Sequence, residues 1–308
     1  MAQVIGKRSG LGLKQADQNL SRFDSSGFGG WRMVSMGNVW DRTTEFLSDN
    51  FSAVLPIAAL AILVPQVLSA VIKHAGPAIP PLLGTGVGLV LLLPVLWGQL
   101  TIAALALDPD SGRNAAQSVA VRRIGEALLA TVILFGLLLL LAAPIPIALE
   151  QNGVDLGAVI AGGPVAQPAL SPGVSTFVRL YGVVWLLVAV FVWIRFSVLL
   201  LAIVAAEGGV LAALRRSYAL SKGIMWKMIG VFLLFGVVFF VAHLAVTSVF
   251  GLLFRFIAPG AGPFGVGAIV VAILGGLLIM AYYVVVSAFS ANLYRAAADT
   301  RKGSAQPA

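Results

Sequence analysis

Long apolar stretches separated by short polar ones dominate the chain. A membrane-spanning helix needs about 20 mostly apolar residues, and six stretches reach that length: Phe51 to Ile72, Leu82 to Leu107, Ala127 to Leu149, Leu180 to Ala206, Met228 to Phe254 and Phe264 to Tyr294. They are apolar on all sides and lack the alternation of barrel strands. The pattern therefore predicts an all-α integral membrane protein, a bundle of six transmembrane helices.

Three amphipathic segments, 38–50, 113–123 and 208–222, each precede an outgoing span. At helical spacing their expected apolar faces carry Trp40, Thr44, Leu47 and Phe51 in the first, and Leu211, Leu214 and Tyr218 in the third. Such helices suit a membrane interface. We expect short interfacial helices on the cytoplasmic side, and a unit of interfacial helix, outgoing span and returning span used three times.

Composition supports the membrane assignment. Charged residues make up 10% of the chain and apolar ones 59%, whereas soluble domains carry roughly 25% charged residues. We expect a flexible polar tail over 1–34, without the apolar core of a cleavable signal peptide, a transmembrane domain over 35–298 and a C-terminal tail over 299–308. The chain has no cysteine, which excludes disulfides, thiol catalysis and cysteine metal sites.

Lysine and arginine set the expected orientation. Six lie before the first span, three after the second, four after the fourth and three in the C-terminal tail, whereas the opposite loops hold only Lys73, Arg179 and Arg255. Positive charge favours the cytoplasmic side. We therefore predict a multi-pass protein of the bacterial cytoplasmic membrane with both termini in the cytoplasm. The net charge of +8 then indicates anionic lipid rather than nucleic acid as a partner.

Segment 207–230, EGGVLAALRRSYALSKGIMWKMIG, carries a recognisable motif. It resembles the signature of the bacterial membrane-domain family named after glycerophosphoryl diester phosphodiesterase, through Glu207, Gly208, Ala213, Leu214, Arg215, Arg216, Ser217, Leu220, Lys222, Gly223 and Trp226. Ser221 replaces the usual threonine. Looser likenesses lie at Val39–Phe51, Arg195 and Asn292–Arg295.

The resemblance implies a membrane domain without an assigned activity. The family name comes from members in which this region is fused to a phosphodiesterase barrel. A (β/α)₈ barrel needs about 250 residues, and the 308 residues here leave no space for one beside six spans. We therefore expect no enzyme and no catalytic residue.

Arg195 is the most informative candidate. If the fourth span is a regular helix ending near Glu207, Arg195 lies about 18 Å inside it, where a charge is costly. One interpretation is a ligand site for a lipid phosphate or acidic substrate. The other is structural, with Arg195 bonded to carbonyls or to Gln99, Asn292 or Tyr282.

Other polar residues within the spans are few. His243 is either a proton relay or, more simply, a hydrogen-bonded packing residue. With His74 it cannot form a three-ligand zinc site without carboxylates, so we expect neither a metal nor a cofactor. Gly260, Gly262 and Gly265 spell GxGxxG but lack the preceding strand that a dinucleotide site requires.

Glycines and prolines within the spans predict local features of the helices. We expect close helix packing at Gly84, Gly88, Gly275 and Gly276, and kinked spans at Pro56, Pro65 and Pro94.

Two functions remain open. The first is a membrane scaffold or accessory protein that interacts with anionic lipid or a membrane or cytoplasmic protein partner. The second is a transporter or flippase-like carrier of a lipid or amphiphile that uses Arg195 in an intramembrane cavity. The candidate contacts for a ligand or lipid phosphate are Arg195, Arg215, Arg216 and Lys222, and the intramembrane polar candidates are Gln99, His243 and Asn292.

Overall fold

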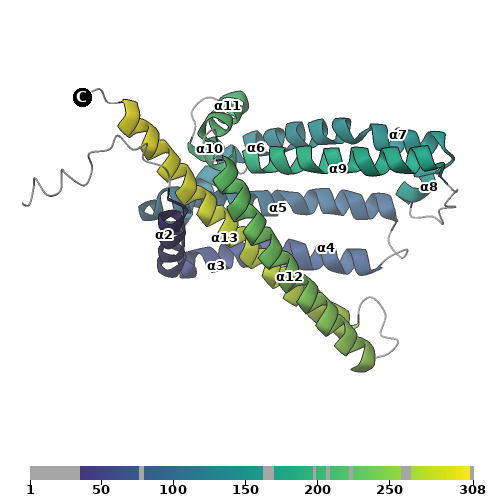
Figure 1. The fold of residues 1–308 in the computed structure, drawn as a ribbon. Coiled ribbons are helices and arrows are strands. Elements are labelled where there is room, and N and C mark those ends of the chain that lie inside the picture. The colour runs from purple at the N-terminus through teal and green to yellow at the C-terminus, as the bar shows by residue number, and fades with distance from the viewer. Residues whose placement is uncertain are drawn as a thin grey trace, which may run out of the picture.

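The computed structural model describes residues 35–75, 80–161, 170–196, 199–205, 209–221, 225–257 and 265–305. Within these ranges the regular elements are helices and no strand occurs. Six helical segments are long and apolar enough to cross a membrane, which confirms the all-α bundle. Four spans run roughly parallel, whereas α12 (Met225–Ile257) and α13 (Val266–Ala305) cross them obliquely as an antiparallel pair (Figure 1).

The first interfacial helix is present as α2 (Met36–Asp49). Its buried residues are Val39, Thr43 and Phe46, whereas Trp40 is 42% exposed. Helix α2 thus packs on α13 through Val39, Thr43 and Phe46 and leaves Trp40 and Phe51 of the predicted apolar face exposed. That exposure is compatible with the predicted contact of this face with the membrane interface.

The first span is built from three pieces: α3 (Phe51–Ala58), a π-helical segment (Ala59–Leu63) and α4 (Val64–Ala75). Pro56 and Pro65 stand on either side of the π-helical segment. Proline removes a helical hydrogen bond, and a π turn is a common way for a helix to absorb a local change of register. Pro56 and Pro65, where kinks were predicted, therefore flank a π-helical segment in the first span.

The second and third spans form an antiparallel hairpin. Helix α5 (Pro81–Leu107) and helix α6 (Gly112–Ala142) are joined by one 3₁₀ turn, Pro109–Ser111. The turn ends at Gly112 with φ 76°, a backbone region that favours glycine. The separate interfacial helix expected over 113–123 was wrong: this segment is continuous with the third span, because it contains no proline and extending a helix costs less than nucleating a new one.

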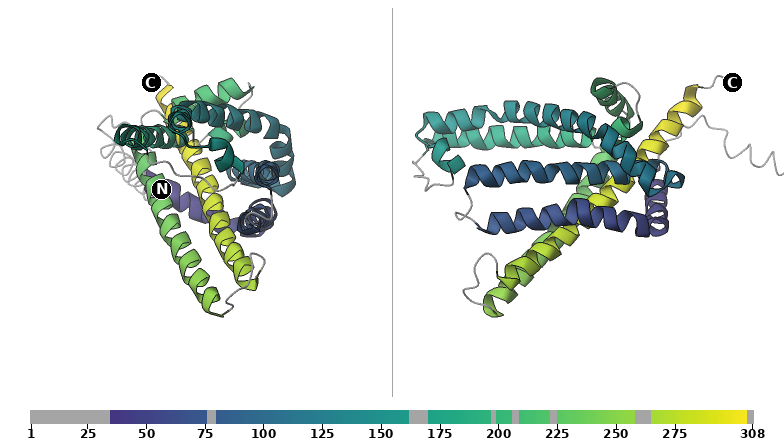
Figure 2. Two further views of the ribbon diagram at one scale, coloured as in Figure 1. Left: turned by 90° about the vertical axis from the view of Figure 1, so that its right-hand side faces the viewer. Right: turned by 180° about the vertical axis from the view of Figure 1, so that it is seen from behind.

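The segment between the third and fourth spans is partly helical. Helix α7 (Pro144–Gln151) follows α6 after one residue, and α8 (Leu156–Ala161) comes next. Helix α9 (Pro172–Arg195) then runs back along α6 (Figures 1 and 2).

Two hydrogen bonds set the register between α6 and α9. The Tyr181 hydroxyl donates to the Leu141 carbonyl at 2.6 Å, and Trp185 Nε1 donates to the Leu138 carbonyl at 3.0 Å. Both acceptors lie in the last two turns of α6. The fourth span is thus fastened to the third by side-chain donors that would otherwise face hydrocarbon unbonded.

The fourth candidate span, Pro172–Ala205, consists of α9 and, after an interruption, α10 (Leu199–Ala205). Helix α11 (Gly209–Ser221) follows it. Helix α11 confirms that 208–222 is largely helical. Its buried residues are Ala213 and Ser217, whereas Leu211 is 69% exposed. Small side chains bring α11 close to α10 and α6, while Leu211 and Tyr218 of the predicted apolar face stay exposed, as contact with a membrane interface requires.

Close helix packing was predicted at four glycines, and the structure confirms it at one of them and not at others. A Cβ on Gly276 would lie 2.9 Å from Leu63 Cδ1, and one on Gly275 would lie 3.4 Å from His243 Cε1. Gly276 therefore permits close packing of α13, as expected, whereas a Cβ on Gly275 would make an ordinary van der Waals contact. Gly88 has open space around it, so that prediction was wrong, whereas Gly98 on α5, which the sequence did not single out, would place a Cβ 2.5 Å from the Cβ of Ala61.

Burial is concentrated toward one end of the bundle, here called the basic end, which holds α2, α11, the start of α6 and the last turns of α13 (Figures 1 and 2). On α5, residues 95–106 are mostly buried, whereas 83–93 are exposed or half-buried on every face. On α12, no described side chain from 233 to 257 is buried. The helices thus pack tightly at the basic end and expose apolar surface to acyl chains elsewhere.

Candidate functional site

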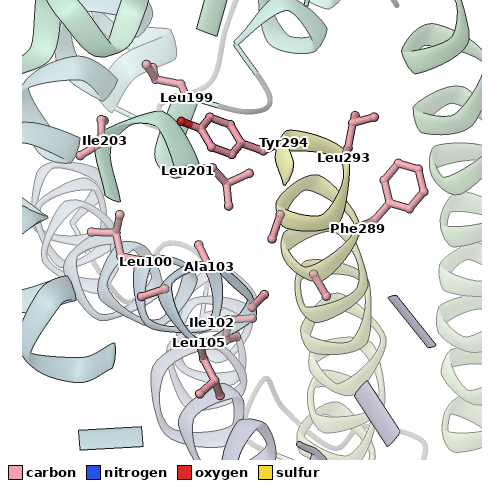
Figure 3. Close-up of a cluster of buried hydrophobic side chains, with 14 of the residues drawn as sticks. Leu100, Ile102, Ala103, Leu105, Leu199, Leu201, Ile203, Phe289, Leu293 and Tyr294 are labelled. Atoms are coloured by element: carbon pink, nitrogen blue, oxygen red, sulfur yellow. The ribbon is translucent and has the colours of Figure 1, made fainter. Parts of the chain in front are cut away.

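A cluster of buried apolar side chains lies where α5, α10 and α13 meet (Figure 3). Its fully buried apolar side chains include Leu100, Ile102, Leu105, Leu201 and Ile203. Phe289 and Leu293 are equally buried but point to the other side of α13, where Phe289 contacts Phe232 and Phe235 of α12. Tyr294 extends from α13 toward Leu199 of α10 and is only 4% exposed. This region is a filled apolar core with a few polar groups at its edge, and the polar groups are the candidates for function.

Asn292, one of the predicted polar candidates, joins α13 to α2. Its side-chain amide donates to the Thr43 hydroxyl at 3.3 Å and to the Ala288 carbonyl at 3.1 Å. Thr43 in turn donates to the Val39 carbonyl at 2.7 Å. Both side chains are buried, so each polar group here has a partner, and the pair has a structural role in docking α2.

Arg216, a predicted lipid-phosphate contact, lies against Tyr294. Its guanidinium carbon is 5.5 Å from the centre of the Tyr294 ring, within range of a cation–π interaction. The neighbouring Arg295 donates to the Ala106 carbonyl at 3.3 Å, where it caps the carboxyl end of α5. Arg215 is exposed on α11. Lys222 lies outside the described residues.

Tyr294 and Ser290 lie one turn apart on the same face of α13. Both are buried, and neither side-chain oxygen has a hydrogen-bond partner among the described residues. Buried polar atoms are nearly always bonded in proteins. The two orphaned oxygens therefore mark this face of α13 as unusual within an otherwise apolar core.

The structure corrects the position inferred for Arg195. Helix α9 ends at this residue, and Phe196 leaves helical geometry with φ −106° and ψ 11°. The expectation of an unbroken helix from Arg195 to Glu207 was therefore wrong. The 24 residues of α9 rise about 36 Å, more than the roughly 30 Å of a hydrocarbon core.

The position of Arg195 relative to α6 indicates how deep in the bundle its backbone lies. Trp185 on α9 lies beside Leu138 on α6, and the two helices run in opposite directions. Arg195, ten residues after Trp185, therefore lies at about the same depth as Leu128, ten residues before Leu138. Glu126, less than one turn away, is paired with Arg123 at 2.9 Å. The backbone of Arg195 thus stands beside the charged end of the third span rather than beside its apolar middle. The Arg195 side chain lies outside the described residues.

His243 lies in the seam between α12 and α13. Its ring stacks on Phe239 with centroids 5.5 Å apart, and Phe239 contacts Tyr282 with centroids 4.7 Å apart. The Nδ1 atom is buried without a hydrogen-bond partner among the described residues. The predicted packing role agrees with this aromatic contact, but the expected hydrogen bond to the ring is not made at Nδ1.

Gln99 and the GxGxxG glycines are the remaining candidates from the sequence. Gln99 is half-buried on α5, beside the glycine that packs on Ala61. Of the GxGxxG glycines, Gly260 and Gly262 fall outside the described residues. Across the described ranges, no group of three His, Asp or Glu side chains is placed to hold a metal ion.

Two contacts were not foreseen in the sequence: Thr43 with Asn292, and Arg216 with Tyr294. The residues of each pair lie on different helices, and no periodicity in a single segment reports such pairings. The only available signal was compositional: a polar Asn within an apolar span is uncommon.

Comparison with known proteins adds no relative: no protein-family model, no curated protein and no solved structure matches the chain. The resemblance to the phosphodiesterase-associated membrane domain therefore stays a prediction.

Proposed function

We propose that this polytopic membrane protein is a scaffold or accessory protein of the bacterial cytoplasmic membrane that holds anionic lipid or a protein partner. In this proposal the basic end faces the cytoplasm, together with both termini, because lysine and arginine concentrate there. No catalytic role is part of the proposal.

One observation carries it: the meeting point of α5, α10 and α13 is filled by apolar side chains. Leu100, Leu105 and Leu201 are each at most 2% exposed. A core packed in this way holds its helices in one arrangement, as a platform for other molecules requires. Exposed arginines on α11 then lie at the rim of a rigid body.

The experiment is native mass spectrometry of the full-length protein released from membranes. We expect phosphatidylglycerol or another anionic lipid to remain bound after delipidation steps that remove phosphatidylethanolamine, or a protein to co-purify at fixed stoichiometry. Equal retention of anionic and zwitterionic lipids, with no co-purifying protein, would contradict the proposal.

A second candidate, a flippase-like carrier, is favoured by the interruption of the fourth span between Arg195 and Leu199. Interrupted spans occur at substrate sites of transporters. The discriminating measurement is transbilayer movement of fluorescent lipid in proteoliposomes. We expect the rate of empty vesicles; faster movement that Arg195→Leu abolishes would favour the carrier instead.

A further inference from the structure

We infer that Arg216, held on the ring of Tyr294, is a specific binding site for the phosphate of an anionic lipid headgroup. The inference rests on the proposed function and narrows it from a basic surface to one residue pair. Three observations support it: the geometry of Arg216 and Tyr294, the lack of a paired carboxylate among the described residues, and the position of the two residues near the end of the last span.

The geometry fixes the guanidinium. Tyr294 is 4% exposed, so its ring is held by the core, and the guanidinium carbon lies 5.5 Å from the ring centre. A guanidinium that lies over a ring keeps the N–H donors of its edge free. Those donors match two oxygens of a phosphate group in bidentate geometry.

The charge of Arg216 is uncompensated within the described part of the chain. No carboxylate there is paired with Arg215, Arg216 or Arg295; the ion pair in this part is Arg123 with Glu126. Arg295 is already committed to the Ala106 carbonyl. Arg216 is exposed and faces an environment from which an anion can reach it.

The position of Arg216 and Tyr294 near the end of a membrane span favours a lipid headgroup over a soluble anion as the ligand. Tyr294 lies within one turn of Ala297, where the apolar part of α13 ends. Headgroup phosphates are the anions concentrated at this depth of a membrane.

The test compares adjacent arginines. The full-length protein in phosphatidylcholine-containing micelles is titrated with phosphatidylglycerol, and the apparent Kd is read from thermal stabilisation. Arg216→Ala should weaken binding roughly tenfold or more, the worth of one or two charge-assisted hydrogen bonds. Arg215→Ala removes the same charge from the same helix and should change the Kd less than about threefold.

A second pair of variants tests the ring. Tyr294→Phe keeps the platform and should bind lipid as the parent does, whereas Tyr294→Leu should weaken binding as Arg216→Ala does. If Tyr294→Leu does not fold, Arg216→Lys replaces it, and we expect a loss close to that of Arg216→Ala because an ammonium has no planar fork.

The outcomes separate the two proposals. Equal losses in Arg215→Ala and Arg216→Ala would overturn the specific site and leave general electrostatic lipid binding intact. Absence of any phosphatidylglycerol effect in the parent protein would overturn both the site and the lipid part of the proposed function. Equal stabilisation by inorganic phosphate alone would show a soluble anion as the ligand and overturn the assignment to lipid.

Discussion

The side-chain amide of Asn292 donates a hydrogen bond of 3.3 Å to the hydroxyl of Thr43, 249 residues earlier in the chain. The bond joins the last span to the helix that precedes the first, so that the two ends of the membrane domain close on each other. Both side chains are buried. Polar groups in such a setting have no water to replace a lost partner.

Removing this amide should therefore destabilise the protein. We expect Asn292→Ala to lower the free energy of unfolding by about 1–3 kcal/mol, read from denaturant unfolding in detergent micelles. The matched control is Asn152→Ala, which removes an exposed amide bonded to the Ala148 carbonyl and should cost less than about 0.5 kcal/mol. Equal effects of the two variants would contradict a buried tie between α2 and α13.

A second prediction concerns the contact of α5 with the π-helical segment of the first span. A Cβ on Gly98 would lie 2.5 Å from the Cβ of Ala61, an atom fixed to the backbone that cannot rotate away. Gly98→Ala should cost about 1–3 kcal/mol through overpacking. Gly88→Ala, on the same helix with open space around it, should be neutral or stabilising by up to about 1 kcal/mol. Thermal unfolding of both variants, each measured against the parent, checks the difference.

A third prediction is the sidedness of the spans. Reporter fusions after Gly112, after Gly209 and at the C-terminus should give cytoplasmic activity, because these positions lie at the basic end. Fusions near Ala78, Gly163 and Gly262 should report the opposite side. A cytoplasmic signal at Gly163 together with cytoplasmic signals at Gly112 and Gly209 would contradict the six-span topology, whereas inverted signals at all positions would contradict only its orientation.

The number and approximate limits of the spans could be predicted because hydrocarbon thickness imposes a length that composition alone reveals. The residues through which α2 and α11 pack on the rest of the protein could not, because the apolar faces in the sequence indicated only the side expected at the membrane interface. In these helices small or polar residues such as Thr43 and Ser217 are buried, since close approach of another helix matters more than side-chain size.

The candidate site was predicted only as a set of residue types. Arg216 was recognised through its charge and motif, and Asn292 through its polarity within a span. Their partners come from other helices, so neither contact leaves a local pattern. The end of α9 had no signal either, because no glycine or proline lies between Arg195 and Leu199 to mark a break.

The last prediction tests that break through the accessibility of Arg195. A thiol reacts with maleimide as a thiolate in contact with water, and the chain has no cysteine of its own, so a single substituted cysteine reports one position. Since α9 ends at Arg195, we expect the Arg195→Cys variant to be labelled by a membrane-impermeant maleimide added to inside-out vesicles. The rate should approach that of Asp110→Cys in the exposed turn before α6.

Leu187→Cys supplies the opposite reference, because it lies eight residues earlier on the same helix and its side chain is 65% exposed on an apolar surface, where a thiol meets lipid rather than water. Labelling of Arg195→Cys as slow as that of Leu187→Cys would place the residue away from water and contradict its position beside the charged end of the third span. Arg195→Leu completes the argument through stability. A cation at a helix carboxyl end is generally worth about 0.3–1 kcal/mol, so we expect this variant to lose no more than that. A gain in stability of several kcal/mol would instead reveal a charge buried in hydrocarbon.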